Sequence, residues 1–105
     1  MELLEGGRGV VARGMLVDLT AERFAAVLAE LAAAGEGDVV VDLAAVPIVD
    51  SRGLLGFVHA AERLEPPAML VVRRPSPAVA RALEVLVQLY EPLATRIRVE
   101  HGDGA

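Results

Sequence analysis

Short runs of β-branched residues alternate with longer segments of helical periodicity, and this alternation most constrains how the chain can fold. The clearest run, DVVVDL at Asp38 to Leu43, is typical of a central strand that is buried on both faces beneath helices. MLVV at Met69 to Val72 indicates another buried strand, and TRIRVE at Thr95 to Glu100 alternates as an edge strand does. Strands that alternate with helices at this spacing predict a mostly parallel sheet with right-handed crossovers.

Three helices are expected between these strands. In AERFAAVLAELAAAG the apolar residues fall at i, i+3, i+4 and i+7, with Thr20 as the expected N-cap and Gly35 as the stop. The segment from Ser51 to Leu64 has a second helical stripe, which a pair of prolines ends. The third helix is expected to open at Pro75-Ser76-Pro77, because proline is tolerated in a first turn.

The N-terminal stretch GVVARGMLVDL, Gly9 to Leu19, predicts two short adjacent strands, VVAR and MLVDL, that meet at Gly14. The expected order is therefore β-β-α-β-α-β-α-β. A chain of 105 residues suffices for one core. We therefore expect a single small α/β domain over residues 1–105, with a mostly parallel or mixed sheet of four to five strands and three to four helices. Its core would span about residues 9–100, with residues 101–105 as a loose tail.

Composition excludes several classes of function. A net charge of −5 with scattered arginines argues against nucleic acid, and 3% aromatic residues are too few for base stacking. The chain has no cysteine, and no second ligand lies at metal-ligand spacing from His59, so no metal site is expected. No glycine-rich phosphate loop is present, so no cofactor is expected either.

The chain is expected to be cytoplasmic, without direct insertion into a membrane. No apolar run approaches the roughly 20 residues that a membrane-spanning helix needs. The first residues, MELLEGGRG, are acidic where a signal peptide would be basic.

One junction, VPIVDSRGLLGF at Val46 to Phe57, joins an apolar segment through Asp-Ser-Arg-Gly to a new helical period. Its simplest interpretation is a helix N-terminus capped by Ser51 or Asp50, which stabilises a fold by about 1 kcal/mol. The same position also suits phosphorylation, because the helix dipole and free amides favour the roughly 1.5 to 2 negative charges that a phosphate adds. Catalysis by Ser51 is disfavoured, because His59 lies roughly 12 Å along the same helix and the G-x-S-x-G elbow is missing. The protein is therefore not expected to be an enzyme.

The segment VVVDLAAVPIVDSRGLLGFVHAAERL resembles the signature of STAS domains, and specifically of anti-sigma factor antagonists. In that family a buried strand ending in Asp-Leu leads through a short loop to Asp-Ser-(Ser)-Gly-Leu at a helix start. The residues that match are Asp42, Leu43, Asp50, Ser51, Gly53 and Leu54. VVRRPSPAVARALEVL and RIRVE resemble later parts of the family, so the resemblance covers about Gly9 to Glu100.

Three positions depart from the family pattern. Arg52 follows the serine where the family commonly has a small residue, and its guanidinium could pair with Asp50 or with a phosphate. Met15 replaces an acidic residue, and Asp18 lies one residue later than the second acidic position of the family.

The resemblance implies a binding module that switches partners. Unphosphorylated, it would bind an anti-sigma factor that is also a serine protein kinase. Phosphorylation of Ser51 by that partner would release it, and a phosphatase would reset it. The protein itself would be a monomer or weak dimer. The expected partner-binding residues are Asp50, Ser51, Arg52, Gly53, Leu55, Gly56, His59 and Asp18.

Two alternatives remain open. One is a STAS scaffold subunit of a membrane complex that transports lipids or anions, in which Ser51 only caps its helix. The other is a ligand-sensing module that uses a pocket near Asp18 and Arg13.

Overall fold

The computed structural model describes residues 1–3 and 8–101, so most of the expected tail at 101–105 lies outside the described residues. In chain order the elements are β1 (Glu2–Leu3), β2 (Gly9–Arg13), α1 (Leu19–Ala33), β3 (Val39–Ala45), α2 (Ser51–Arg63), β4 (Leu70–Arg73), α3 (Pro77–Leu89), the 3₁₀ helix η1 (Glu91–Thr95) and β5 (Ile97–Glu100). The radius of gyration of 12.3 Å is close to the roughly 13 Å typical of a single domain of this length.

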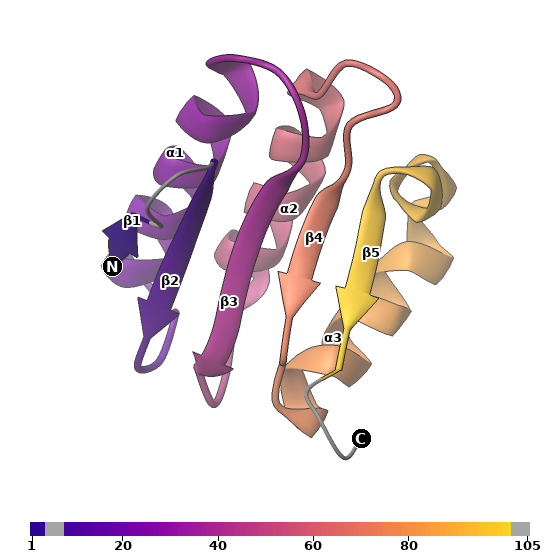
Figure 1. The fold of residues 1–105 in the computed structure, drawn as a ribbon. Coiled ribbons are helices and arrows are strands. Elements are labelled where there is room, and N and C mark those ends of the chain that lie inside the picture. The colour runs from indigo at the N-terminus through magenta and orange to yellow at the C-terminus, as the bar shows by residue number, and fades with distance from the viewer. Residues whose placement is uncertain (4–7, 102–105) are drawn as a thin grey trace.

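The five strands form one sheet in the order β1-β2-β3-β4-β5. Strand β1 is antiparallel to β2, and all other neighbours are parallel. Strand β3 is central, with Val41 paired to Val10 on one side and to Val72 on the other. The predicted α/β class and the mixed, mostly parallel sheet are thus confirmed, and β5 lies at an edge as predicted (Figure 1).

All three α-helices of the described residues lie on one face of this sheet (Figure 1). The prediction that the valine run of β3 is covered by helices on both faces is therefore wrong. Val39, Val41 and Leu43 alternate into the core beneath the helices and are fully buried, whereas Val40 is half-buried on the other face. A run of β-branched residues predicts a strand, but it does not determine whether helices cover one face of the sheet or both.

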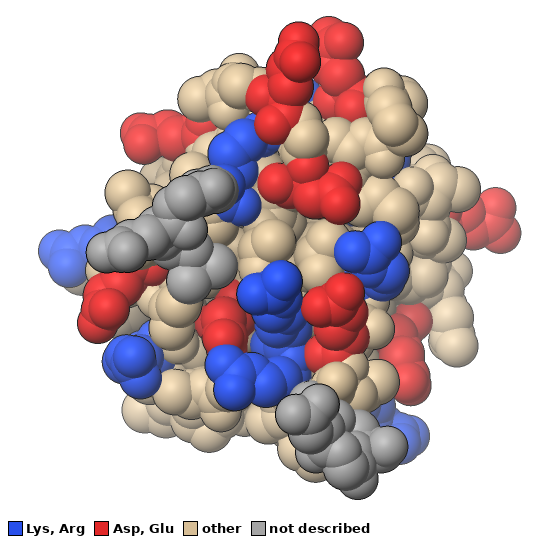
Figure 2. Space-filling model, in the orientation of Figure 1, with Lys and Arg blue, Asp and Glu red and all other residues tan. Residues whose placement is uncertain are grey.

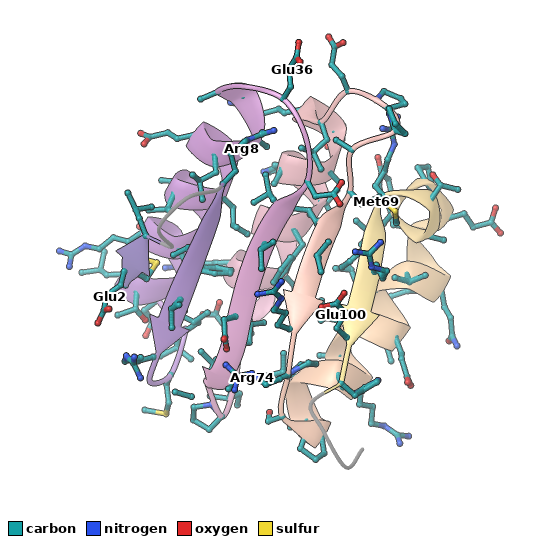
Figure 3. All side chains as sticks on the ribbon, viewed as in Figure 1. Glu2, Arg8, Glu36, Met69, Arg74 and Glu100 are labelled. Carbon is teal, nitrogen blue, oxygen red and sulfur yellow. The ribbon has the colours of Figure 1, made fainter. Side chains whose placement is uncertain are left out.

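Charged side chains of both signs lie on the face without helices (Figure 2), and ion pairs join several of them. Asp42 is the one buried charged residue among those described, at 9% exposure, and it pairs with the guanidinium of Arg74. Burial raises the pKa of Asp42, but the N–H of Ala44 and this guanidinium outweigh burial and lower it. Arg73 lies 3.4 Å from Glu100, and Figure 3 shows Arg74 and Glu100 on this face.

The second predicted strand, MLVDL, does not form. Within it Leu16 makes only an isolated bridge to Val49, and α1 already begins at Leu19. The chain bends at Gly14, where φ is 78°, and the segment then leaves the sheet and runs parallel to the loop between β3 and α2. The true additional strand is β1, which sequence reasoning missed because it has only two residues.

Thr20 is not the N-cap of α1, as had been expected. The helix begins at Leu19, two residues earlier than an N-cap at Thr20 would give, and its N-cap residue Asp18 makes no side-chain capping bond. The Thr20 hydroxyl instead accepts from the N–H of Val17 at 3.0 Å and lies 2.9 Å from the carbonyl oxygen of Met15. These hydrogen bonds of the Thr20 hydroxyl therefore fix the backbone segment just before α1.

Helices α1 and α2 pack closely against each other. A Cβ placed on Gly56 would lie 2.7 Å from Cβ and 2.9 Å from Cα of Ala25, so only glycine permits this approach. The rings of Phe24 and Phe57 meet edge to face at 5.5 Å beneath the contact. This packing fixes the position of α2 relative to α1.

Candidate functional site

The candidate site is the N-terminus of α2, where the chain leaves the sheet after β3. Asp50 has extended backbone geometry there, and its Oδ1 accepts from the N–H groups of Arg52 at 3.0 Å and Gly53 at 3.2 Å. Asp50 is therefore the N-cap, as one of the two sequence interpretations held. Ser51 is the first residue of the helix itself.

Ser51 is exposed, and within residues 1–3 and 8–101 its hydroxyl makes no hydrogen bond. The interpretation that Ser51 only caps its helix is therefore wrong, because the carboxylate of Asp50 does that. A hydroxyl at the first helical position is open to solvent and lies beside the positive end of the helix dipole. This location suits the transfer of an anionic group onto the hydroxyl.

Asp50 also ties the segment before α1 to the start of α2. Its Oδ2 accepts from the backbone N–H of Asp18 at 2.8 Å. Asp18 has φ of 51°, a left-handed conformation that is strained for a residue with a side chain and is found where the surroundings enforce it. The N–H of Asp18 is the main reason that the pKa of Asp50 is lowered, with further lowering from Gly53 and Arg52.

Arg52 extends from α2 toward the first turn of α1. Its Nη1 lies 3.2 Å from Oε1 of Glu22 and 4.0 Å from Oδ1 of Asp18. Exposed ion pairs of this kind contribute at most about 1 kcal/mol to the free energy of unfolding, so their main effect is to orient the guanidinium of Arg52. The structure thus brings Asp18 to the site, and Glu22 joins it. The sequence analysis did not identify Glu22, because its place in the first turn of α1 was the only signal that could have indicated it.

The remaining predicted residues divide into exposed and buried ones. Leu55 and His59 are exposed one and two turns beyond Ser51. Gly53 and Gly56 are buried, and a Cβ on Gly53 would lie 2.5 Å from Cγ1 of Val49. The two glycines have no side chain to present to a partner, and their expected part in partner binding stays a prediction. They let α2 approach its neighbours closely, and the partner-binding role of the exposed residues stays a prediction.

Exposed apolar side chains lie on the segments that adjoin the serine. Met15, Leu19, Ile48 and Leu55 are each about half exposed or more, and only Leu55 had been singled out from the sequence. They come from segments held together by the Leu16–Val49 bridge and the bond between Asp18 and Asp50. We call the exposed residues of these segments the Ser51 surface: Met15, Asp18, Leu19, Glu22, Ile48, Ser51, Arg52, Leu55 and His59. Apolar residues with a charged rim are typical of protein–protein interfaces.

The described residues give little support to a ligand pocket at Asp18 and Arg13, to a metal site or to a membrane-spanning helix. Three cavities of about 570, 380 and 350 Å³ lie elsewhere, and neither Asp18 nor Arg13 lines any of them. Within residues 1–3 and 8–101, no group of three or more His, Asp or Glu side chains could hold a metal ion. In the same part of the chain, every helix is too short or too polar to cross a membrane.

Comparison with protein families identifies the class of this domain. A family model described as "Mlab, STAS domain" matches residues 6–87, which is well over half of the chain and includes Ser51 and the whole of α2. The chain therefore belongs to the STAS domain family, in agreement with its five-stranded mixed sheet and the resemblance noted in its sequence. A search among curated proteins gives no match.

Proposed function

We propose that this STAS domain is an antagonist of an anti-sigma factor that acts by switching partners in the cytoplasm. Unphosphorylated, it binds an anti-sigma factor that is also a serine protein kinase, using the Ser51 surface. Phosphorylation of Ser51 releases the partner, and a phosphatase restores binding. The observation that carries this proposal is the free hydroxyl of Ser51 at the first position of α2, with Asp50 supplying the cap.

The site explains why a phosphate is tolerated by the domain. The group projects from an exposed position at a helix N-terminus, where the dipole favours negative charge, and no core residue has to move. Because the cap belongs to Asp50, modification of Ser51 removes no hydrogen bond that the described residues make.

The same charge disfavours the complex. Asp50, Asp18 and Glu22 already make this surface acidic, and exposed apolar side chains adjoin it. A partner that buries these side chains must also desolvate the phosphate, which carries about 1.5 to 2 negative charges. A cost of a few kcal/mol at the interface lowers affinity by two to three decades.

The catalytic groups for phosphoryl transfer are assigned to the partner, so the domain is a substrate and not an enzyme. Activation of Ser51 within this chain would need a base in hydrogen-bond reach. His59 lies eight residues further along the same helix, which corresponds to roughly 12 Å of axial rise. The ATP would be held by the kinase.

A kinase assay tests this proposal. The domain is incubated with a cognate anti-sigma kinase and ATP, and intact mass is measured. We expect a gain of one phosphate, its loss in Ser51→Ala, and its retention in Ser76→Ala, which changes the serine at the start of α3. No gain in the unchanged domain, or an equal gain in Ser51→Ala, contradicts the proposal.

The position of Arg52 favours a second candidate, a scaffold subunit of a membrane complex that transports lipids or anions. A guanidinium beside Ser51 can neutralise a phosphate, which would weaken a switch based on charge. The matching family model is also described by Mlab rather than by an anti-sigma factor antagonist. For this candidate we expect an unchanged mass after the kinase assay, together with constitutive binding to a transport ATPase through the Ser51 surface.

A further inference from the structure

Strand β5 is an edge strand, and no strand of the described residues pairs with its outer side. Its inner side faces β4, where the carbonyl oxygens of Arg96 and Glu100 each accept a backbone N–H at 2.7 Å. Successive residues of a strand direct their backbone groups to alternate sides, so those of Ile97 and Val99 point away from β4. Within residues 1–3 and 8–101, these outward N–H and C=O groups have no hydrogen-bond partner. Such an edge is a template for another extended chain.

Helix α3 extends over this free edge, and the two elements enclose a groove. Figure 1 shows α3 passing behind β5 and reaching beyond its outer side. The cavity of about 350 Å³ is lined by residues of α3, η1 and β5, and β4 contributes none of its lining. Its walls are largely apolar, formed by Leu83, Val87, Ala94, Ile97 and Val99. We call this cavity the α3–β5 groove.

The rim of the α3–β5 groove carries a negative charge. Glu84 and Gln88 line the groove from α3 and are exposed, about one helical turn apart. In the part of the chain that the structure describes, the carboxylate of Glu84 makes no ion pair. Its complement is therefore a lysine or arginine on the molecule that fills the groove.

We propose that the α3–β5 groove binds an extended segment of another protein, which adds to β5 as a further strand of the sheet. The backbone of this segment pairs with the outward N–H and C=O groups of Ile97 and Val99. Side chains alternate along a strand, so every second one points under α3, against Leu83 and Val87. The segment is therefore apolar at alternate positions and carries a lysine or arginine that faces Glu84.

The two walls of the groove together select this occupant. A small apolar molecule would fill the space beneath α3 but leave the backbone groups of Ile97 and Val99 unpaired. A second copy of the chain could offer its own β5 only by bringing its own α3 into the same space, because α3 overhangs β5 in each copy (Figure 1). An extended segment that carries no covering helix satisfies the backbone edge and buries the apolar walls at once.

The expected binding is weak. Strand β5 has four residues, so the contact with an added strand lies at the low end of specific interfaces. We expect a dissociation constant on the order of 10 µM to 1 mM. The groove shares no residue with the Ser51 surface, so the inference does not depend on the proposed function. Ser51→Asp should leave binding in the groove unchanged.

Peptide display on the whole domain supplies a probe. A library of random short peptides is selected on the unchanged domain and counter-selected on Val99→Pro. The N–H of Val99 points outward, so proline there removes no bond to β4 but blocks an added strand. We expect the surviving peptides to alternate apolar residues and to include a lysine or arginine. If no peptide survives the counter-selection, or the survivors have no such alternation, the proposal is overturned.

Three variants then test the groove with one surviving peptide, by calorimetric titration. Val99→Pro should weaken binding roughly tenfold or more, whereas Val99→Thr, which keeps the N–H, should weaken it less than about threefold. Circular dichroism checks that both variants are folded. Glu84→Lys changes only an exposed side chain, so it should fold normally and weaken the same peptide about fivefold. Equal losses in Val99→Pro and Val99→Thr, or no loss in Glu84→Lys, would overturn the proposal.

Amide hydrogen exchange tests the strand pairing itself. Saturation with the peptide should slow exchange of the Ile97 and Val99 amides roughly tenfold or more, because they gain acceptors. The amides of Arg98 and Glu100 face β4 and should change less, so they serve as controls in the same strand. A bound peptide that protects neither Ile97 nor Val99 would show that it lies elsewhere, and the proposal would fail.

Discussion

Two serines stand at two helix N-termini in this domain, and their hydroxyls are used in opposite ways. Ser76 is the N-cap of α3, where its Oγ accepts from the N–H of Val79 at 3.3 Å and lies 3.4 Å from the carbonyl oxygen of Pro47. Ser51 is one position inside α2, because the carboxylate of Asp50 already supplies the cap. A difference of one position relative to the helix start therefore decides whether the serine hydroxyl caps the helix or makes no capping hydrogen bond.

The two helices also differ in how firmly they are held. Helix α2 packs against α1 at Gly56, and its N-cap Asp50 accepts a hydrogen bond from the N–H of Asp18 just before α1. Helix α3 has two fully buried residues, and its apolar side chains of Val85 and Leu89 are exposed. A free side chain on a rigid element is well suited to recognition, since little order is lost when a partner binds.

The largest expected effect separates the two serines in binding. Ser51→Asp should lower the affinity for the anti-sigma factor by two to three decades, because it places a charge where the proposed partner is matched to a neutral hydroxyl. Ser76→Asp should leave that affinity unchanged, since aspartate is itself a good N-cap and Ser76 lies on another helix. Calorimetric titration of both variants measures the difference, and equal losses would contradict the comparison.

The next effect tests the rigidity of α2. Gly56→Ala should destabilise the fold by about 1 to 3 kcal/mol, because the new methyl group meets the backbone of Ala25 at 2.9 Å. Val85→Ala on α3 should cost less than about 0.5 kcal/mol under dilute conditions, since Val85 is half exposed. Urea denaturation measures both changes. A cost of Val85→Ala as large as that of Gly56→Ala would mean that α3 is held as firmly as α2.

A smaller effect distinguishes the capping serine from the free one in stability. Ser76→Ala should cost about 1 kcal/mol, because it leaves the N–H of Val79 without its acceptor. Ser51→Ala should stay within about 0.5 kcal/mol of the unchanged domain, because its hydroxyl makes no bond within the described residues. Urea denaturation of the two variants under one set of conditions compares them, and a reversed order would show that Ser51 carries the cap.

Much of the fold could be predicted from the sequence wherever one local signal dominates. The valine run of β3 and the apolar period of α2 were identified correctly, and so was the Pro-Ser-Pro opening of α3. The strand predicted at MLVDL was wrong, because the bend at Gly14 and the contact with the loop after β3 override the β-propensity of its residues. Propensity alone cannot register such tertiary contacts.

The candidate site was predictable in position but not in detail. Asp50 and Ser51 are adjacent, and both are good N-caps, so only the backbone geometry decides between them. The close approach at Gly56 depends on Ala25, which is distant in sequence. The strained backbone of Asp18 makes a hydrogen bond to Asp50, which lies 32 residues away in the sequence. None of these contacts between distant residues leaves a pattern in the local sequence.

The smallest expected effect is a pH dependence of stability, which the carboxylate cap Asp50 of α2 can produce and the hydroxyl cap Ser76 of α3 cannot. The folded structure lowers the pKa of Asp50 below its usual 3.8, so its ionised form contributes stability above that pH. This contribution is lost as the pH falls below 3.8 through the lowered pKa of the folded state. Asp50→Asn retains a capping oxygen but cannot ionise.

The domain should therefore exceed Asp50→Asn in stability at neutral pH, and the difference should shrink in acid, as the pH falls below 3.8 through the lowered pKa of Asp50. Asp42, whose pKa is also lowered, is present in both proteins and cancels in the difference. The cost of Ser76→Ala should be the same at both pH values, because a hydroxyl cap does not titrate there. Urea denaturation at each pH measures these differences. A gap between the domain and Asp50→Asn that widens in acid would mean that the ionised carboxylate does not hold the start of α2.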